Sequence, residues 1–151
     1  MIVADTGAIV ALIDRSDRHH EVLMAIYEED PSQWVLPWAI LPEVDYLVGK
    51  FLGPKAEEAW LADLAGGVFR IEWGREDDLA RAHALVRRYR ALELGLVDAV
   101  VIVVAERLHA SAIATLDLRH FGAVTITHRP ALLPRDRAWH QKLSVPSTRS
   151  W

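Results

Sequence analysis

The sequence predicts a single α/β domain with a central, mostly parallel β-sheet flanked by α-helices, and three observations support this fold class. Short apolar runs of strand length alternate with amphipathic segments of helix length, which is the pattern of βα units. The 151 residues, 52% of them hydrophobic, are enough for one ordinary domain with a sizeable core. Four acidic residues stand where predicted strands end or predicted helices begin, and a parallel sheet gathers those positions at one edge.

The predicted strands are short runs of apolar residues. The run MIVAD opens the chain and ends in an acid, and WVLP is short enough to be a buried strand. The run SAIATLD likewise ends in an aspartate. We expect the strands at residues 1–5, 34–37, 68–73, 111–117 and 123–127.

The predicted helices lie between these runs, and several carry signals at their ends. Pro42 falls in the first turn of one helix and Gly53 lies just past its end, which is the usual asymmetry of helix termini. A longer helix has its acids early and its arginines late, as the helix dipole favours. We expect these helices at residues 6–13, 19–30, 40–52, 54–67 and 75–93.

The segment LVDAVVIVVAERL is the hardest to assign. Its β-branched residues favour a buried strand by propensity, but it is longer than a usual strand. Ala99, Ala105 and Glu106 suit a helix that is apolar on most sides. We therefore predict a buried helix from Val97 onward, with Asp98 in its first turn. A carboxylate that enters an apolar interior needs a hydrogen bond, an ion pair or a metal, so this aspartate must have a partner.

The four acids at the segment boundaries supply that partner. Asp5 and Asp117 each close a predicted strand, whereas Glu43 and Asp98 each open a predicted helix. Each one alone could be a helix cap or a favourable charge at a helix start. Gathered at one edge of a sheet they repel one another, and a shared cation relieves this repulsion. A set of oxygen ligands suits Mg²⁺ or Mn²⁺, so the sequence predicts a metal site.

Composition excludes several other classes of protein. The chain has no cysteine, which rules out disulfide scaffolds, thiolate zinc sites and cysteine nucleophiles. No apolar stretch approaches the roughly 20 residues that a membrane span requires, and the start of the chain lacks the features of a signal peptide. We expect a cytoplasmic protein that has no contact with a membrane. The net charge of −4 argues against general coating of nucleic acid but leaves room for a localised basic groove.

Four segments of the chain resemble, in order and spacing, the four acidic motifs of PIN-domain ribonucleases. They are VADTGAIVALIDRSDRHH, ILPEVDYLV, LVDAVVIVVAERL and SAIATLDLRHF. The resemblance is strongest to the VapC toxins of VapBC toxin–antitoxin pairs, and it extends from Ile2 to about Pro134. It implies a PIN-like domain over residues 1–134. Residues 135–151 form a C-terminal extension, and we expect about its last ten residues to be disordered.

The resemblance also implies an activity and a site. The activity is Mg²⁺- or Mn²⁺-dependent endonucleolytic cleavage of RNA by a homodimer that a VapB-like antitoxin inhibits. The antitoxin is expected to thread a segment over the site and to offer an arginine to the carboxylates. The resemblance implies an acidic site formed by Asp5, Glu43, Asp98 and Asp117, with the hydroxyls of Thr6 and Thr115 beside it.

Each site residue has an expected role. Asp5 and Asp98 are predicted to bind the metal directly, and Asp117 directly or through water. Glu43 is predicted to act indirectly or as the base for the attacking water. Arg119 and His120 follow Asp117 closely enough to contact a substrate phosphate, although a surface turn explains them equally well.

Several alternatives remain open from sequence alone. The chain could be a housekeeping PIN nuclease of RNA processing, or an inactive PIN-like module that binds RNA or protein. A structural oligomer with the acids as mere caps is the simplest alternative. The signature Asp5-Thr6-Gly7 also occurs in aspartic proteases, but those enzymes are all-β and a helix is predicted here. Trp139 and Trp151 in the basic tail could stack on RNA bases.

Overall fold

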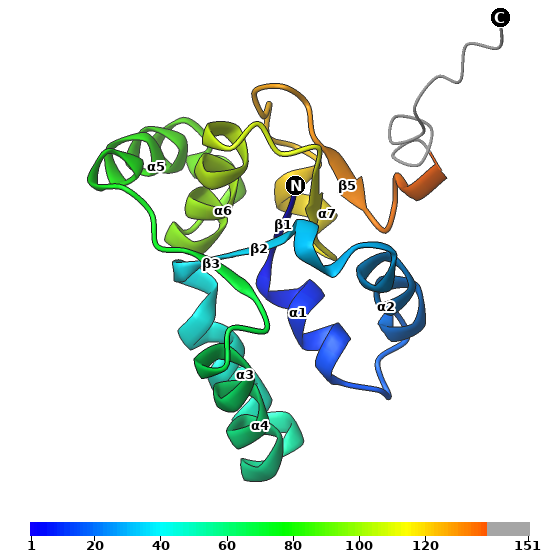
Figure 1. Ribbon diagram of the computed structural model, residues 1–151. Coiled ribbons are helices and arrows are strands. Elements are labelled where there is room, and N and C mark those ends of the chain that lie inside the picture. The colour runs from blue at the N-terminus through cyan, green and yellow to red at the C-terminus, as the bar shows by residue number, and fades with distance from the viewer. Residues whose placement is uncertain (139–151) are drawn as a thin grey trace, which may run out of the picture.

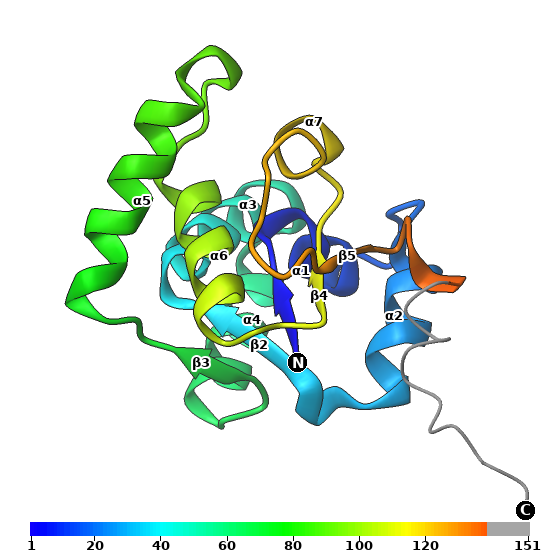
Figure 2. The same cartoon turned by 90° about the horizontal axis from the view of Figure 1, so that it is seen from above.

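A five-stranded, fully parallel sheet forms the centre of the computed structural model, which describes residues 1–138 (Figures 1 and 2). Its spatial order is β3-β2-β1-β4-β5, and every neighbouring pair is parallel. The strands are β1 (Ile2–Ala4), β2 (Trp34–Pro37), β3 (Arg70–Glu72), β4 (Ala112–Ala114) and β5 (Ala131–Leu133). The predicted fold class is confirmed.

Helices follow the strands and cover the sheet. Both views show α5 and α6 together at one side of the molecule and α2 at the opposite side, while α3 and α4 pack side by side. Their bounds are α1 (Thr6–Ile13), α2 (His20–Glu29), α3 (Leu41–Leu52), α4 (Pro54–Ala65), α5 (Glu76–Arg88), α6 (Leu96–Arg107) and α7 (Leu118–Phe121). Three short 3₁₀ turns complete the order: η1 (Pro31–Gln33), η2 (Trp38–Ile40) and η3 (Arg90–Leu92). Within the described part of the chain, no helix has the length and apolar character needed to cross a bilayer.

The hydrophobic helix α6 occupies the middle of the core. All residues from 99 to 105 are buried, and the helix packs against β1, β2 and α5. Burial on nearly every side suits a helix that is apolar all round, so packing outweighs the strand propensity of its valines. The predicted helix is confirmed, with Asp98 in its first turn.

The predicted strand at 123–127 is wrong, because the fifth strand is β5 at Ala131–Leu133. Val124 and Ile126 are buried in alternation, as the pattern indicated. The intervening amides, however, bond to side chains from distant elements. Thr125 N–H donates to the Tyr89 hydroxyl (3.0 Å) and Thr127 N–H to Glu106 Oε1 (3.1 Å). Amides that are satisfied by side chains have no need of a neighbouring strand.

Two other boundaries differ from the prediction. The helix expected over 75–93 ends at Arg88, and the separate turn η3 follows it. Residues 135–138, the start of the predicted extension, contact the domain: Arg137 pairs with Glu29 at 2.8 Å. Residues 139–151, with Trp139 and Trp151, lie outside the described residues.

Candidate functional site

The site begins where β1 and β4 end side by side. Ala4 is paired with Ala114 in the sheet, so the next residues, Asp5 and Thr115, emerge together at the carboxyl edge. Asp5 N–H donates to the Ala114 carbonyl (2.9 Å), which continues the ladder to the last residue before α1. Parallel strand order alone therefore places two predicted site residues in contact.

Asp5 is buried, with 6% of its surface exposed. It occupies the N-cap position of α1, but its side chain makes no cap hydrogen bond. Its Oδ2 instead accepts a hydrogen bond from the Thr115 hydroxyl at 3.0 Å. Burial raises the pKa of Asp5 to about 6, and the negative charges of Asp98 and Asp117 add to this effect against hydrogen bonds from Thr115 and Thr6. Helix capping therefore does not explain this aspartate.

Two buried threonines are the chain neighbours of this site, Thr6 next to Asp5 in sequence and Thr115 directly after the end of β4. Thr115 Oγ1 donates to Asp5 and accepts from Asp117 N–H at 3.0 Å, so it links two of the acids. Thr6 is also buried, and its Oγ1 has no hydrogen-bond partner among the described residues. A buried polar atom without a partner is costly, so the Thr6 hydroxyl is available to a ligand such as the water of a bound ion.

Asp98 lies half-buried in the first turn of α6. Its Oδ2 accepts a long hydrogen bond (3.4 Å) from Gly95 N–H, so it also serves as a helix-capping residue. Burial raises the pKa of Asp98, and the nearby charges of Asp117 and Glu43 raise it further. The Gly95 amide and the charge of His120 act in the opposite direction.

His120 connects the acids to a neighbouring loop. Its Nδ1 lies 2.6 Å from Asp117 Oδ2 and 3.8 Å from Asp98 Oδ2, and its Nε2 lies 2.7 Å from the Leu92 carbonyl. A carboxylate and a carbonyl can only accept, so both ring nitrogens act as donors and the ring is an imidazolium. The hydrogen bond to Asp117 raises the pKa of His120 accordingly. Partial burial acts to raise the pKa of Asp117, but its bonds to His120 outweigh this and lower it.

Three side chains in this group could hold a metal ion. Ligand atoms of Asp98, Asp117 and His120 all lie within 4.8 Å of one another. Asp5 adjoins them through Thr115. Carboxylate oxygens with one imidazole suit a divalent cation. The residues present therefore fit a metal centre.

Two predicted residues lie at the margin of this cluster. Glu43 is exposed in the first turn of α3, and its charge acts on Asp98. Arg119 is exposed in α7 and makes no ion pair within residues 1–138. The prediction from sequence missed the Leu92 carbonyl, which bonds His120, and the Gly95 amide, which bonds Asp98. Every residue has these backbone groups, so the residue type does not indicate which of them takes part in a site.

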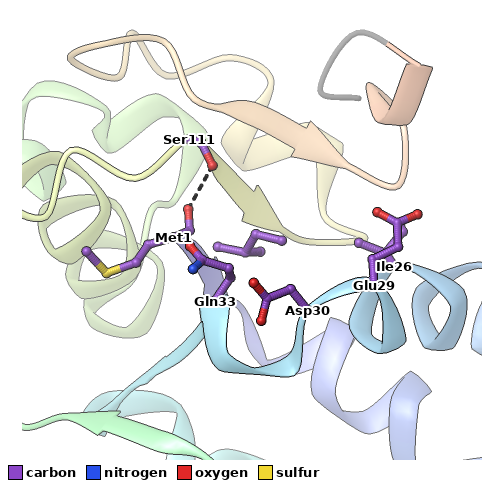
Figure 3. A pocket seen from close by; sticks show the side chains of 7 residues that line it. Met1, Ile26, Glu29, Asp30, Gln33 and Ser111 are labelled. Carbon is purple, nitrogen blue, oxygen red and sulfur yellow. Dashed lines mark hydrogen bonds between the residues drawn. The ribbon is translucent and has the colours of Figure 1, made fainter. Parts of the chain in front are cut away.

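A cavity of about 350 Å³ lies at the opposite edge of the sheet (Figure 3). Met1, Gln33 and Ser111 line it, and each directly precedes a parallel strand. The Ser111 hydroxyl donates to the Met1 carbonyl at 3.0 Å. This cavity therefore faces away from the acids and is not part of their site.

Comparison with known proteins identifies the family of this chain. The family model of the PIN domain matches residues 2–125. Ribonuclease VapC26 of Mycobacterium tuberculosis is 31% identical over 123 residues, which cover 82% of this chain and 91% of that protein. The chain therefore belongs to the PIN-domain family, and within it to the group of the VapC ribonucleases.

Solved structures share the fold. The sarcin–ricin-loop-cleaving toxin VapC20 of Mycobacterium tuberculosis superposes with a TM-score of 0.75 at 22% identity, over 86% of this chain and 99% of that one. VapBC2 of Rickettsia felis, bound to a fragment of its promoter DNA, gives 0.64 at 17% identity, over 87% and 97% of the two chains. A toxin–antitoxin complex from Klebsiella pneumoniae gives 0.62 at 23% identity, over 86% and 99%.

Proposed function

We propose that this protein is a metal-dependent endoribonuclease and the toxin of a toxin–antitoxin pair. The observation that carries the proposal is the convergence of Asp5, Asp98 and Asp117 at one sheet edge, where burial and mutual repulsion raise the pKa of the first two. Kinship with a protein named ribonuclease VapC26 supports RNA as the substrate. Asp5 is buried but does not cap its helix. This disfavours the alternatives in which the protein is an inactive binding module or the acids serve only as helix caps.

In this proposal three aspartates bind the metal ion, and one glutamate activates the attacking water. Asp5 and Asp98 would hold Mg²⁺ or Mn²⁺ directly, and Asp117 would hold it directly or through water. Such an ion supplies a Lewis acid for the scissile phosphate and lowers the pKa of a bound water. Glu43, exposed at the rim beside Asp98, is assigned to accept the proton of the attacking water. Thr115 orients Asp5 and Asp117 through its two hydrogen bonds.

Two basic residues near the acids, Arg119 and His120, are candidates for binding the substrate phosphate. The Arg119 guanidinium, in α7, forms no ion pair with any residue of 1–138 and can bind two phosphate oxygens in a bidentate manner. His120 has both nitrogens engaged, by Asp117 and by Leu92. It therefore contacts a phosphate, or an ion, only by giving up one of these bonds. Until then its positive charge offsets the repulsion between Asp98 and Asp117.

Two protein partners belong to the proposal. The fold is shared with complexes described as toxin–antitoxin and VapBC assemblies, which supports a VapB-like antitoxin as inhibitor. An arginine from that partner would suit the acidic cluster, since a guanidinium matches carboxylates geometrically. A homodimer is the expected state of the free chain, and light scattering after size-exclusion chromatography tests it.

The deciding experiment is RNA cleavage by the purified, partner-free chain with Mg²⁺ or Mn²⁺. The substrates are a pool of structured RNAs and a sarcin–ricin-loop oligonucleotide, the latter because a structural neighbour is described as cleaving it. We expect cutting that both EDTA and Asp98→Asn abolish, while Asp77→Asn, an exposed acid on α5, leaves it unchanged. A folded wild type that binds neither ion would show that the acids are structural and would refute the proposal.

A further inference from the structure

The outward face of α3 carries an aromatic–cation strip, Tyr46, Lys50 and Phe51, that starts one turn from Glu43. Residues three, four and seven apart share one face of a helix, so Glu43, Tyr46 and Lys50 are aligned. The opposite face of α3 is buried through Val44 and Val48. At about 1.5 Å per residue, the strip extends roughly 10 Å from the candidate site.

Both aromatic rings of the strip are exposed to solvent. Tyr46 exposes 62% of its surface and Phe51 exposes 68%. The Lys50 ammonium lies between them, 5.6 Å from the centre of the Tyr46 ring and 5.2 Å from that of Phe51. Such cation–π contacts stabilise an exposed ring and orient the ammonium without neutralising its charge.

Lys50 is also free of acidic partners: within residues 1–138 it forms no ion pair. It therefore presents a full positive charge close to a site dominated by carboxylates, on a chain whose net charge is −4. A polyanion that approaches those carboxylates needs local cations to counter the repulsion. Lys50 and Arg119 provide such cations on two different helices, α3 and α7.

The chemistry of the strip favours nucleic acid over protein. Exposed tyrosine and phenylalanine occur in both kinds of interface, but cores of protein interfaces are depleted of lysine. Sites for single-stranded nucleic acid combine aromatic rings with cations. We propose that the strip binds a single-stranded segment of the RNA substrate next to the scissile phosphate, with Tyr46 stacking on a base and Lys50 binding a phosphate. This inference rests on the proposed function for the identity of the substrate strand.

Binding in the absence of cleavage tests the strip directly. The probe is a fluorescein-labelled single-stranded RNA of about 12 nucleotides, titrated with the full chain in EDTA and followed by fluorescence anisotropy. Tyr46→Ala loses the stacking of one base and should therefore bind the RNA probe about 5- to 150-fold more weakly than wild type. Tyr46→Phe keeps the ring and should bind the probe with wild-type affinity. Lys50→Ala should reduce the slope of log affinity against log salt by about 0.7.

Matched controls come from exposed residues off the strip. Lys55→Ala on α4 and Trp73→Ala beyond β3 remove a lysine and an aromatic of similar exposure, and both should bind the probe like wild type. Equal affinities of wild type and Tyr46→Ala, or no binding of the probe by wild type, would overturn the proposal. So would a change of oligomeric state in Tyr46→Ala, seen by light scattering, because it would assign the face to a protein contact.

The cleavage assay separates this proposal from the one on which it rests. Where wild type cuts RNA, Tyr46→Ala should raise KM by a factor similar to its loss of affinity and leave kcat within about twofold. Where wild type binds the probe through Tyr46 but cuts no RNA with either ion, the strip stands as an RNA-binding surface and the nuclease proposal fails.

Discussion

Arg107 links three elements, α6, α5 and β3, through its hydrogen bonds. From the end of α6, its Nε and Nη2 donate to both carboxylate oxygens of Asp78 on α5, each at 2.9 Å. Its Nη2 also donates to Glu72 of β3 at 2.9 Å. The side chain of Asp78 is only 5% exposed, and it also accepts from the Arg75 amide at 2.9 Å. A bidentate, buried pair of this kind is costly to break, because one partner is left as an unpaired buried charge.

The first prediction concerns Arg107→Ala. We expect this variant to lose about 3 to 5 kcal/mol of unfolding free energy at pH 7, measured by urea denaturation. Arg81→Ala, which breaks a more exposed pair with Glu106, should lose no more than about 1 kcal/mol and serves as the control. Equal losses in the two variants would show that burial of the pair with Asp78 is unimportant.

The same pair predicts a pH dependence. Burial acts to raise the pKa of Asp78, but the bonds from Arg107 and the Arg75 amide outweigh it and lower that pKa. A carboxyl with a lowered folded-state pKa stabilises the fold fully above its ordinary value of about 3.9, and this stabilisation is lost as the pH falls through the folded-state value. The stability gap between wild type and Arg107→Ala should therefore narrow below pH about 4. A difference in unfolding free energy between the two proteins that stays constant down to pH about 2 would contradict the lowered pKa of Asp78.

At the scale of elements, the junction between α3 and α4 depends on one glycine. Gly53 is both the C-cap residue of α3 and the N-cap residue of α4, with φ 92° and ψ 175°. Only glycine adopts this region of backbone conformation without strain. A side chain here would meet no atom within 4 Å, so the backbone angle alone sets the cost of substitution.

A third prediction follows from that angle. Gly53→Ala should lower the unfolding free energy by about 1 to 3 kcal/mol, measured by chemical denaturation. Gly95 offers a control, since it also precedes a helix with open space around it, but its φ is −92°. Gly95→Ser, with a good capping residue, should stay within about 0.5 kcal/mol of wild type. A comparable loss at both positions would rule out the backbone explanation.

Elements differ in how far the sequence predicts them, and α6 and residues 123–127 show why. The helix is long enough for its length to outweigh the β-propensity of its valines, so it is predictable. The segment 123–127 has the alternation of a strand, and Val124 and Ile126 are indeed buried. Its backbone partners are side chains of α6 and of Tyr89, far away in sequence. No local pattern encodes such partners, so the error was unavoidable from local evidence.

The same distinction holds for the site. Asp5, Asp98 and Asp117 are predictable because each stands at a segment boundary, and parallel topology gathers the ends of β1 and β4. The links between them are not predictable in the same way. That Thr115 would bond both Asp5 and Asp117, and that His120 would bond the carbonyl of the last residue of η3, depends on distances that only the assembled fold sets.

At the scale of the whole molecule, the site should couple global stability to the ion. Asp5 is buried with a pKa raised to about 6, so at pH 7.5 the metal-free protein holds a poorly solvated charge near Asp98 and Asp117. Asp5→Asn removes that charge, and its amide can still accept the Thr115 hydrogen bond. In EDTA at this pH, we expect the variant to be about 1 to 3 kcal/mol more stable than wild type.

Adding the ion should reverse that order. Binding to the folded state stabilises wild type by about 4.1 kcal/mol at one thousand times the Kd, which exceeds the advantage of the variant in EDTA and raises Tm by roughly 10 °C for a domain of this size. Asp5→Asn, having lost a ligand, should gain much less from Mg²⁺ or Mn²⁺ in the same thermal scan, and Asp77→Asn should follow wild type. A variant less stable than wild type in EDTA would mean that Asp5 serves the fold rather than the ion, since a charge kept for binding destabilises the protein until its ligand arrives.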